Sequence, residues 1–187
     1  MRPWIAVAVA ALAVGLSLVV NPARAAEPAA VDYSPLKMQE GVWDADITFF
    51  DPATGQPSGS ARGVQTNTLL MNGHWVLNDM KVFGAEGQKV TFEGRGLWGW
   101  DKAAREYIDT WVDTNDGPVR IDHGFWKADT RTMYWTALQS DGEGRSVNLR
   151  MTEVYDGDLR TLTFHQVALQ SGRLVKMAEM KFRRRKG

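Results

Sequence analysis

Short runs of alternating apolar and polar residues begin at Gly41 and continue toward the end of the chain. In the run WDADITF (residues 43–49), the apolar side chains share one face and the polar side chains share the other. The run VNLRMTEVY (residues 147–155) alternates in the same way, with Glu153 on the apolar face. Successive side chains of a β-strand point to opposite faces, so both runs predict strands with one buried face. No stretch of this region has the sustained period of an amphipathic helix.

Clusters of turn-forming residues divide this region at fairly even intervals and separate runs rich in Val, Thr, Trp, Tyr and Phe. Asn72-Gly73 and Ser171-Gly172 are typical of tight hairpins, because Asn and Gly tolerate positive φ. The nine clusters are residues 51–57, 72–73, 84–88, 101–105, 115–118, 127–130, 140–144, 156–158 and 171–172. They imply ten strands in an antiparallel meander. Closing such a sheet leaves no exposed edge, so we predict an all-β, up-and-down barrel.

A barrel of about ten strands is wider than its own side chains need to fill it, so an internal cavity is expected. Large aromatic side chains and adaptable methionines suit the wall of an apolar pocket, although they can also simply fill a core. A polar end of a ligand would be oriented by Asp113 or Glu153. The predicted wall consists of Trp43, Trp75, Trp98, Tyr107, Trp111, Phe125, Trp126, Trp135 and Met151. The expected ligand is a small apolar or amphipathic molecule.

Carboxylates in the fifth predicted strand add a polar feature to this cavity. Tyr107 and Trp111 share one face with Asp109 and Asp113, but the opposite face is also partly apolar, so its inward direction is open. An inward carboxylate would be partly buried and would need a partner.

Arg95 and Arg150 are candidate partners for such a carboxylate. The same cavity supports an alternative function, an isomerase, cyclase or hydratase with Tyr107, Asp109 or Glu153 as acid or base. A third hypothesis is a fully packed barrel that acts as an envelope interaction module through its surface or its basic tail.

The first residues have the pattern of a secretory signal peptide. An N-terminal Arg2 precedes an apolar run over residues 4–20, and Ala23-Arg24-Ala25 has the small-residue pattern of a cleavage site. We predict cleavage after residue 25 and a periplasmic protein without stable membrane insertion; a retained anchor is the alternative. Residues 26–35 then form a flexible lead-in, and residues 36–185 form the barrel domain. Ser34-Pro35 is predicted to cap a short helical turn through Gln39.

Composition removes several classes of function. The 22 basic and 22 acidic residues balance, which argues against nucleic-acid binding. The absence of cysteine excludes disulfides, thiolate zinc sites, iron–sulfur clusters and a lipidated N-terminus. The three histidines lie in separate runs without metal-ligand spacing, so we expect neither a metal nor a cofactor. A monomer and a homodimer both remain open.

The run GRGLWGWD (residues 94–101), followed by Tyr107 and WVD (residues 111–113), resembles the exported bacterial Domain of Unknown Function 1579 family. Its G-x-G-x-x-G lies within a strand pattern with no following helix, so it is not a dinucleotide fingerprint. The resemblance extends over roughly residues 36–185. The family is grouped with calycins, the lipocalin-like and nitrobindin-like barrels, which implies a ten-stranded barrel and small-ligand binding by analogy.

The same resemblance raises haem as an alternative ligand, because nitrobindin-like barrels hold haem through a histidine near the chain end. Here residues 172–184 contain no histidine, and Met177 and Met180 occupy that region. Haem is therefore the less favoured alternative.

Overall fold

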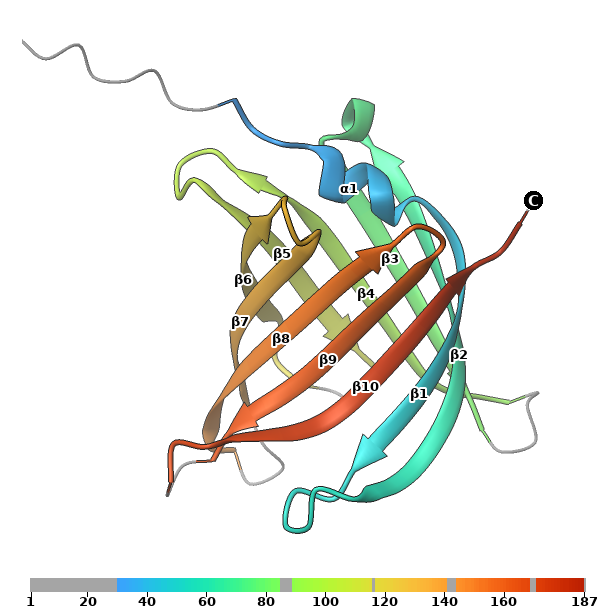
Figure 1. Cartoon of the computed structure of the whole chain (residues 1–187), viewed down its shortest axis with the longest axis vertical. Helices are drawn as coiled ribbons and strands as arrows, with labels where there is room; N and C mark the ends of the chain where they lie inside the picture. The colour runs from blue at the N-terminus through green and yellow to red at the C-terminus, as the bar shows by residue number, and fades with distance from the viewer. Residues whose placement is uncertain (1–29, 85–88, 116, 141–143, 169–170, 187) are drawn as a thin grey trace, which may run out of the picture. The chain divides into compact units, whose positions relative to one another are not determined.

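The computed structural model describes residues 30–84, 89–115, 117–140, 144–168 and 171–186. The predicted signal peptide and the first part of the lead-in lie outside the described residues. In the described part of the chain, one short helix is followed by ten antiparallel strands that form a closed barrel (Figure 1). The elements are α1 (Ser34–Gln39), β1 (Gly41–Phe50), β2 (Pro57–Leu70), the single 3-10 turn η1 (Met71–Gly73), β3 (Trp75–Phe83), β4 (Val90–Asp101), β5 (Glu106–Asp113), β6 (Arg120–Lys127), β7 (Thr132–Ser140), β8 (Ser146–Asp156), β9 (Leu159–Val167) and β10 (Leu174–Arg184).

Each strand pairs with its neighbours in sequence, and β1 also pairs with β10, which closes the sheet. Trp43 lies opposite Arg184 and Phe49 lies opposite Ala178 across this closure. A closed sheet has no unpaired edge, which is the physical reason for preferring a barrel over an open meander. The all-β barrel predicted from the turn spacing is confirmed.

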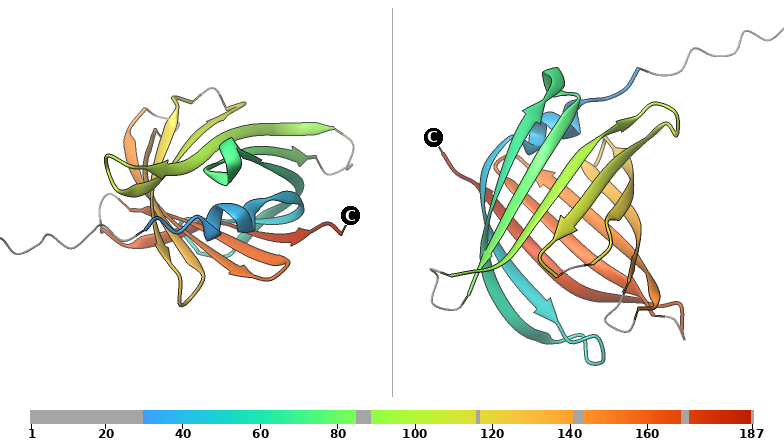
Figure 2. Two further views of the ribbon diagram at one scale, coloured as in Figure 1. Left: turned by 90° about the horizontal axis from the view of Figure 1, so that it is seen from above. Right: turned by 180° about the vertical axis from the view of Figure 1, so that it is seen from behind.

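Helix α1 crosses one end of the barrel, as the view along the barrel shows (Figure 2, left). Pro35 lies in its first turn, where a missing N–H costs nothing, and the carboxylate of Asp32 accepts a hydrogen bond from the Ser34 backbone N–H. The N-cap is Tyr33, without a side-chain cap, and Ser34 already lies inside the helix. The helix was therefore predicted correctly, whereas its cap lies one residue earlier than expected.

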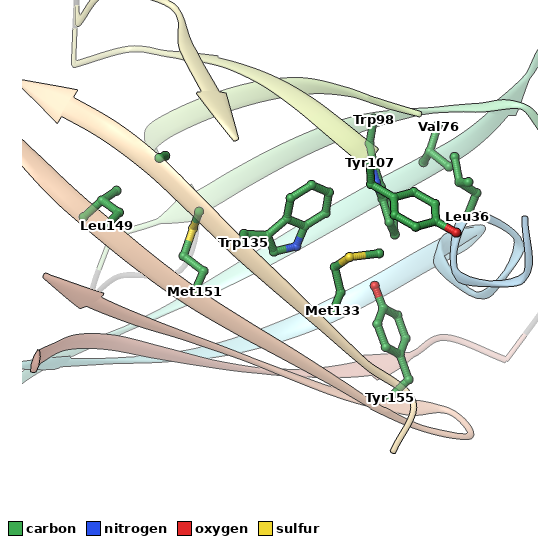
Figure 3. Close-up of a cluster of buried hydrophobic side chains, with 10 residues drawn as sticks. Leu36, Val76, Trp98, Tyr107, Met133, Trp135, Leu149, Met151 and Tyr155 are labelled. Atoms are coloured by element: carbon green, nitrogen blue, oxygen red, sulfur yellow. The ribbon is translucent and has the colours of Figure 1, made fainter. Parts of the chain in front are cut away.

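Leu36 inserts the apolar face of α1 into this end of the barrel, where it is fully buried. Figure 3 shows Leu36 beside Val76, Trp98 and Tyr107, with Leu149 at the far end of the same row of buried side chains. Burying a leucine side chain is worth about 1.5–3 kcal/mol, so Leu36 seals this end and stabilises the closed barrel.

The segment before α1 is also attached to the barrel. The Tyr107 hydroxyl donates a hydrogen bond to the Asp32 carbonyl, and Trp126 Nε1 donates one to Asp32 Oδ2 at 2.9 Å. The Tyr33 ring stacks on His74 with the ring centroids 4.6 Å apart. These contacts fix the position of α1 from its N-terminal side. None of the helices among the described residues is long and apolar enough to cross a membrane.

Candidate ligand-binding cavity

A cavity of about 440 Å³ lies inside the barrel, beyond the side chains that pack around Leu36. Most of its wall is apolar and comes from the inward faces of β3, β4, β5 and β7 to β10. Aromatic rings and thioethers dominate this wall, as the sequence predicted. The apolar lining consists of Phe49, Met80, Val82, Phe92, Trp98, Trp111, Trp135, Val147, Leu149, Met151, Leu162, Phe164, Met177, Ala178, Met180 and Phe182.

The cavity opens at the end of the barrel that lies away from α1. Its lining there includes Asn115, which follows β5, and Gln139 near the end of β7, and both are exposed. At the α1 end its lining residues Gln39, Glu153 and Arg160 are all buried. A ligand would therefore enter from the end opposite the helix and meet a polar floor.

A hydrogen-bonded network built around Gln39 forms this floor. Gln39 Nε2 donates to Glu153 Oε1 at 3.0 Å and also to the hydroxyl of Tyr155. Arg160 Nη1 donates to Glu153 Oε1 at 3.0 Å and to the Gln39 side-chain oxygen, while its Nη2 donates to the side-chain oxygen of Gln65. A buried ion pair needs further hydrogen bonds to offset its desolvation, and Gln39 and Gln65 supply them to the two terminal nitrogens of Arg160.

Trp43 lies within the same floor. Its Nε1 donates to the Gln39 carbonyl oxygen at 2.8 Å. The guanidinium carbons of Arg160 and Arg184 lie 4.9 Å and 4.1 Å from the centroid of its ring. The indole ring is therefore fully buried and makes cation–π contacts with both guanidinium groups. It supports the floor and does not line the cavity.

Two aspartates face each other partway along the wall. Asp109 on β5 and Asp122 on β6 are directly opposite in the strand register. Arg120 binds Asp122 with both donors, at 2.6 Å from Nε to Oδ1 and 2.9 Å from Nη2 to Oδ2. Burial raises the pKa of Asp109 well above its ordinary value, and the nearby charges of Asp122 and Glu153 add to this effect, opposed by Arg120. Asp109 is thus a buried carboxyl that favours its protonated form.

Two inward-facing glycines of β4 make room for the polar and aromatic side chains of β5. A Cβ at Gly94 would lie 2.2 Å from Cζ2 of Trp111, and a Cβ at Gly96 would lie 2.7 Å from Oδ1 of Asp109. The close backbone approach expected of this glycine pair is therefore present, and it is filled by neighbouring side chains. Trp111 Nε1 in turn donates to Asp113 Oδ2 at 2.9 Å.

Several buried polar atoms of the cavity wall find no hydrogen-bond partner among the described residues. They are Asn78 Oδ1, Trp98 Nε1, Asp109 Oδ1 and Arg160 Nε. Leaving a buried polar group unpaired costs roughly 1–3 kcal/mol, so native interiors rarely contain several together. The wall of this cavity therefore has unused hydrogen-bonding capacity.

Comparison with known proteins places this barrel in a family. The family described as Protein of unknown function (DUF1579) matches residues 33–184. The chain belongs to the DUF1579 family. Among solved structures, the S-type phycobiliprotein lyase CPES from Guillardia theta is similar, with a TM-score of 0.53 and 9% identity over 81% of this chain and 91% of that chain. At this identity the similarity concerns the fold alone. A search of curated proteins finds no match.

Six of the eleven predicted site residues line the cavity of this DUF1579 barrel. They are Trp98, Trp111, Asp113, Trp135, Met151 and Glu153. The structure also decides the direction of β5, because its Asp109, Trp111 and Asp113 all face the cavity. Their role in binding a ligand remains a prediction.

The other five residues lie elsewhere. Trp43 belongs to the floor, and Tyr107 and Trp126 pack in the core beside α1, where both donate to Asp32. Trp75 points away from buried Val76 and packs its ring over Gly99.

Phe125 is on the outer surface, 66% exposed, so its assignment to the cavity wall is wrong. The physical reason is strand alternation. Phe125 and Trp126 are adjacent on β6 and cannot share a face. Gly124 and Trp126 lie on the inner face, which places Phe125 outside.

The expected arginine partners are also wrong. Arg95 binds Asp79 at the outer surface, with 3.0 Å between Nη2 and Oδ2, and Arg150 is exposed. The arginine beside Asp109 is Arg120. The alternation of Arg120, Asp122 and Gly124 on one face of β6 was the available signal, but it became recognisable only once that face was known to point inward.

No local pattern indicates the role of Gln39, which depends on contacts with β8 and β9 more than one hundred residues away. Asn78 was likewise missed, because a single asparagine in a strand has no distinguishing pattern.

Histidines and metal ligands do not gather at this cavity. His74, His123 and His165 are all described by the structure, and none of them lines the cavity. His123 contacts Glu106 on the outer surface, 2.7 Å from Nδ1 to Oε1. The cavity therefore offers no imidazole to a haem iron. Within the described ranges, no three His, Cys, Asp or Glu side chains are arranged to hold a metal ion.

Proposed function

We propose that this protein is a binding barrel that holds one small amphipathic molecule in its internal cavity. The observation that supports this proposal is the internal cavity. Its volume of about 440 Å³ falls within the range of roughly 300–1,000 Å³ that is usual for small-molecule sites. Its wall combines a continuous apolar surface with a few convergent polar groups, which is the composition expected of such a site.

The envelope interaction hypothesis required a packed interior and is disfavoured by this cavity. The proposed location remains the periplasm, on the basis of the signal-peptide pattern in residues 1–25. In that compartment the barrel would act on a molecule that passes through or resides in the cell envelope.

An enzyme is the second candidate, and one observation favours it. Asp109 is a buried carboxyl with a raised pKa, and it faces a cavity large enough for a substrate. Such a group can serve as a general acid near neutral pH. The phycobiliprotein lyase shows that a barrel of this fold can belong to an enzyme.

The test is native mass spectrometry of the protein isolated from the periplasm, repeated after denaturation. We expect a polypeptide shortened by residues 1–25 and an additional small mass that is lost on denaturation. Recovery of the uncleaved chain in the membrane fraction would overturn the proposed location.

Tryptophan fluorescence provides the complementary test, because Trp98, Trp111 and Trp135 line the cavity. An occupying ligand should shift or quench their emission. Absence of any response to fatty acids, quinones, alcohols and amines, together with a clean polypeptide mass, would overturn the proposed function.

A further inference from the structure

The cavity wall contains more acidic than basic side chains, which restricts the charge of the ligand in the proposed binding function. Among the described lining residues there are four carboxyl groups, Asp109, Asp113, Asp122 and Glu153, against two arginines. Arg120 is committed to Asp122 through two hydrogen bonds, and Arg160 is committed to Glu153. The two carboxyl groups left over both belong to β5. An anionic ligand would lie beside acidic side chains here, whereas a cation would favour the ionised form of Asp109.

Four polar atoms of the wall are unpaired among the described residues: Trp98 Nε1 and Arg160 Nε are donors, whereas the two acceptors, on Asn78 and Asp109, agree with this charge. Asn78 lies opposite Gly96 in the β3–β4 register and is only 5% exposed. The Oδ1 of Asp109 lies over the same Gly96, within 2.7 Å of the position that a Cβ would occupy. Asn78 Oδ1 and Asp109 Oδ1 are therefore unpaired acceptors on either side of one residue without a side chain. When Asp109 is ionised both oxygens accept hydrogen bonds, so a cationic ligand group with N–H donors can pair with them.

Aromatic rings surround the same part of the wall. Trp98 and Trp111 occupy inward positions on β4 and β5, and the rings of Trp98 and Trp135 contact each other with centroids 5.3 Å apart. Indole rings attract cations through their electron-rich faces. They also present a large apolar surface to the rest of a ligand.

We infer that the cavity binds an amphipathic amine, whose cationic nitrogen lies between Asp109 and Asn78 and whose apolar body lies against the aromatic and methionine wall. An ammonium group donates hydrogen bonds to both unpaired acceptors and stabilises the ionised carboxylate of Asp109. An alcohol carries no charge and has a single O–H donor, so it could pair with only one of the two acceptors, and a fatty acid carboxylate would supply neither the donors nor the positive charge.

Binding of a cation beside Asp109 is coupled to the protonation of its carboxyl group. Asp109 is faced by Asp122 and Arg120 from β6 and by Glu153 from β8. Burial and the two acidic neighbours raise its pKa, so the empty cavity favours the protonated carboxyl. A bound cation favours the carboxylate, and binding should therefore release a proton. Below the pKa of Asp109, the affinity for a permanently charged cation should rise by up to about tenfold per pH unit.

The experiment compares four ligands with the same apolar chain: decylamine, decyltrimethylammonium, decanol and decanoic acid. Binding to the full-length mature protein is followed by tryptophan fluorescence and by calorimetry. We expect decylamine to bind at least about tenfold more tightly than decanol and decanoic acid. Decyltrimethylammonium should show the rise of affinity with pH, because its own charge does not titrate.

Asp109→Asn tests the proposed contact, since it keeps the shape of the side chain and removes its charge. It should reduce the preference for decylamine over decanol to within about twofold and abolish the pH dependence. Asp46→Asn is the matched control, because Asp46 is 82% exposed on the outer face of β1. Asn78→Leu removes the second acceptor and provides an independent variant should Asp109→Asn fold poorly.

The outcomes separate this inference from the function on which it rests. Equal or tighter binding of decanol or decanoic acid would overturn the amine inference and leave a binding barrel in place. Unchanged selectivity in both Asp109→Asn and Asn78→Leu would overturn it as well. Failure of all four ligands to bind would count against the binding function itself.

Discussion

The indole of Trp111 on β5 occupies the space that a side chain at Gly94 on β4 would need, since a Cβ there would lie 2.2 Å from Cζ2 of the ring. Trp111 can therefore lie against the β4 backbone and contribute to the cavity wall. The glycine pair of the G-R-G-L-W-G run thus has a structural explanation. Absence of side chains on one strand allows large side chains on the next to shape the cavity.

Gly94→Ala should displace Trp111 and destabilise the barrel. Forcing a methyl group into a filled position typically costs about 1–3 kcal/mol in the free energy of unfolding. Chemical denaturation measures this loss. Gly59→Ala is the control in β2, because the nearest atom to its added Cβ would be Phe49 Cδ2 at 3.8 Å, an ordinary contact. Equal stability of both variants would contradict the proposed fit.

The raised pKa of Asp109 predicts how stability changes with pH. The folded protein holds this proton more tightly than the unfolded chain does, so the free energy of unfolding should fall as pH rises from about 4 toward the raised pKa. The slope contributed by one such group is at most about 1.4 kcal/mol per pH unit.

Asp109→Asn should remove this contribution and become more stable relative to the wild type as pH rises through that window. Urea unfolding at several pH values gives the difference directly. The stability of Asp46→Asn should change with pH in the same way as that of the wild type. A stability difference for Asp109→Asn that is independent of pH would refute the shifted titration.

Removing one partner of the buried ion pair between Arg160 and Glu153 should strongly lower the free energy of unfolding. Arg160→Ala leaves Glu153 buried without its partner and should cost about 3–5 kcal/mol. Arg62→Ala, which breaks the exposed pair with Asp46, should change stability by less than about 1 kcal/mol. Thermal and chemical unfolding distinguish the two. Similar losses in both variants would show that burial does not set the value of the floor pair.

Filling the cavity should weaken ligand binding without a comparable loss of stability. Leu149→Trp replaces a lining leucine with a larger indole side chain that occupies part of the cavity. We expect at least about tenfold weaker binding of decylamine. Leu138→Trp is the control on the outer face of β7, where the native side chain is 64% exposed. Fluorescence titration would contradict the internal site if both variants bound equally well.

The strand pattern was readable from the sequence because alternation and turn chemistry are local properties. Alternation in the run from Trp43 to Phe49 indicates which face of the strand is buried, and Asn72-Gly73 marks the turn after β2. These signals, repeated along the chain, were sufficient to predict ten strands and a closed barrel. They also placed Met151 and Glu153 on the apolar face of β8, whereas Trp98 and Trp135 were predicted as wall residues from their size and aromatic character.

The sequence by itself thus determined the strands, their order and the aromatic and methionine character of the wall, with Trp98, Trp111, Trp135 and Met151 among its lining residues. Only the tertiary structure decided which face of β5 points inward, because both of its faces carry apolar side chains. It alone brought Gln39 to Glu153 and Arg160, and Asn78 to the Gly96 gap beside Asp109. The physical reason is that these groups meet across the closed barrel. Their proximity depends on strand register and closure, which no local pattern encodes.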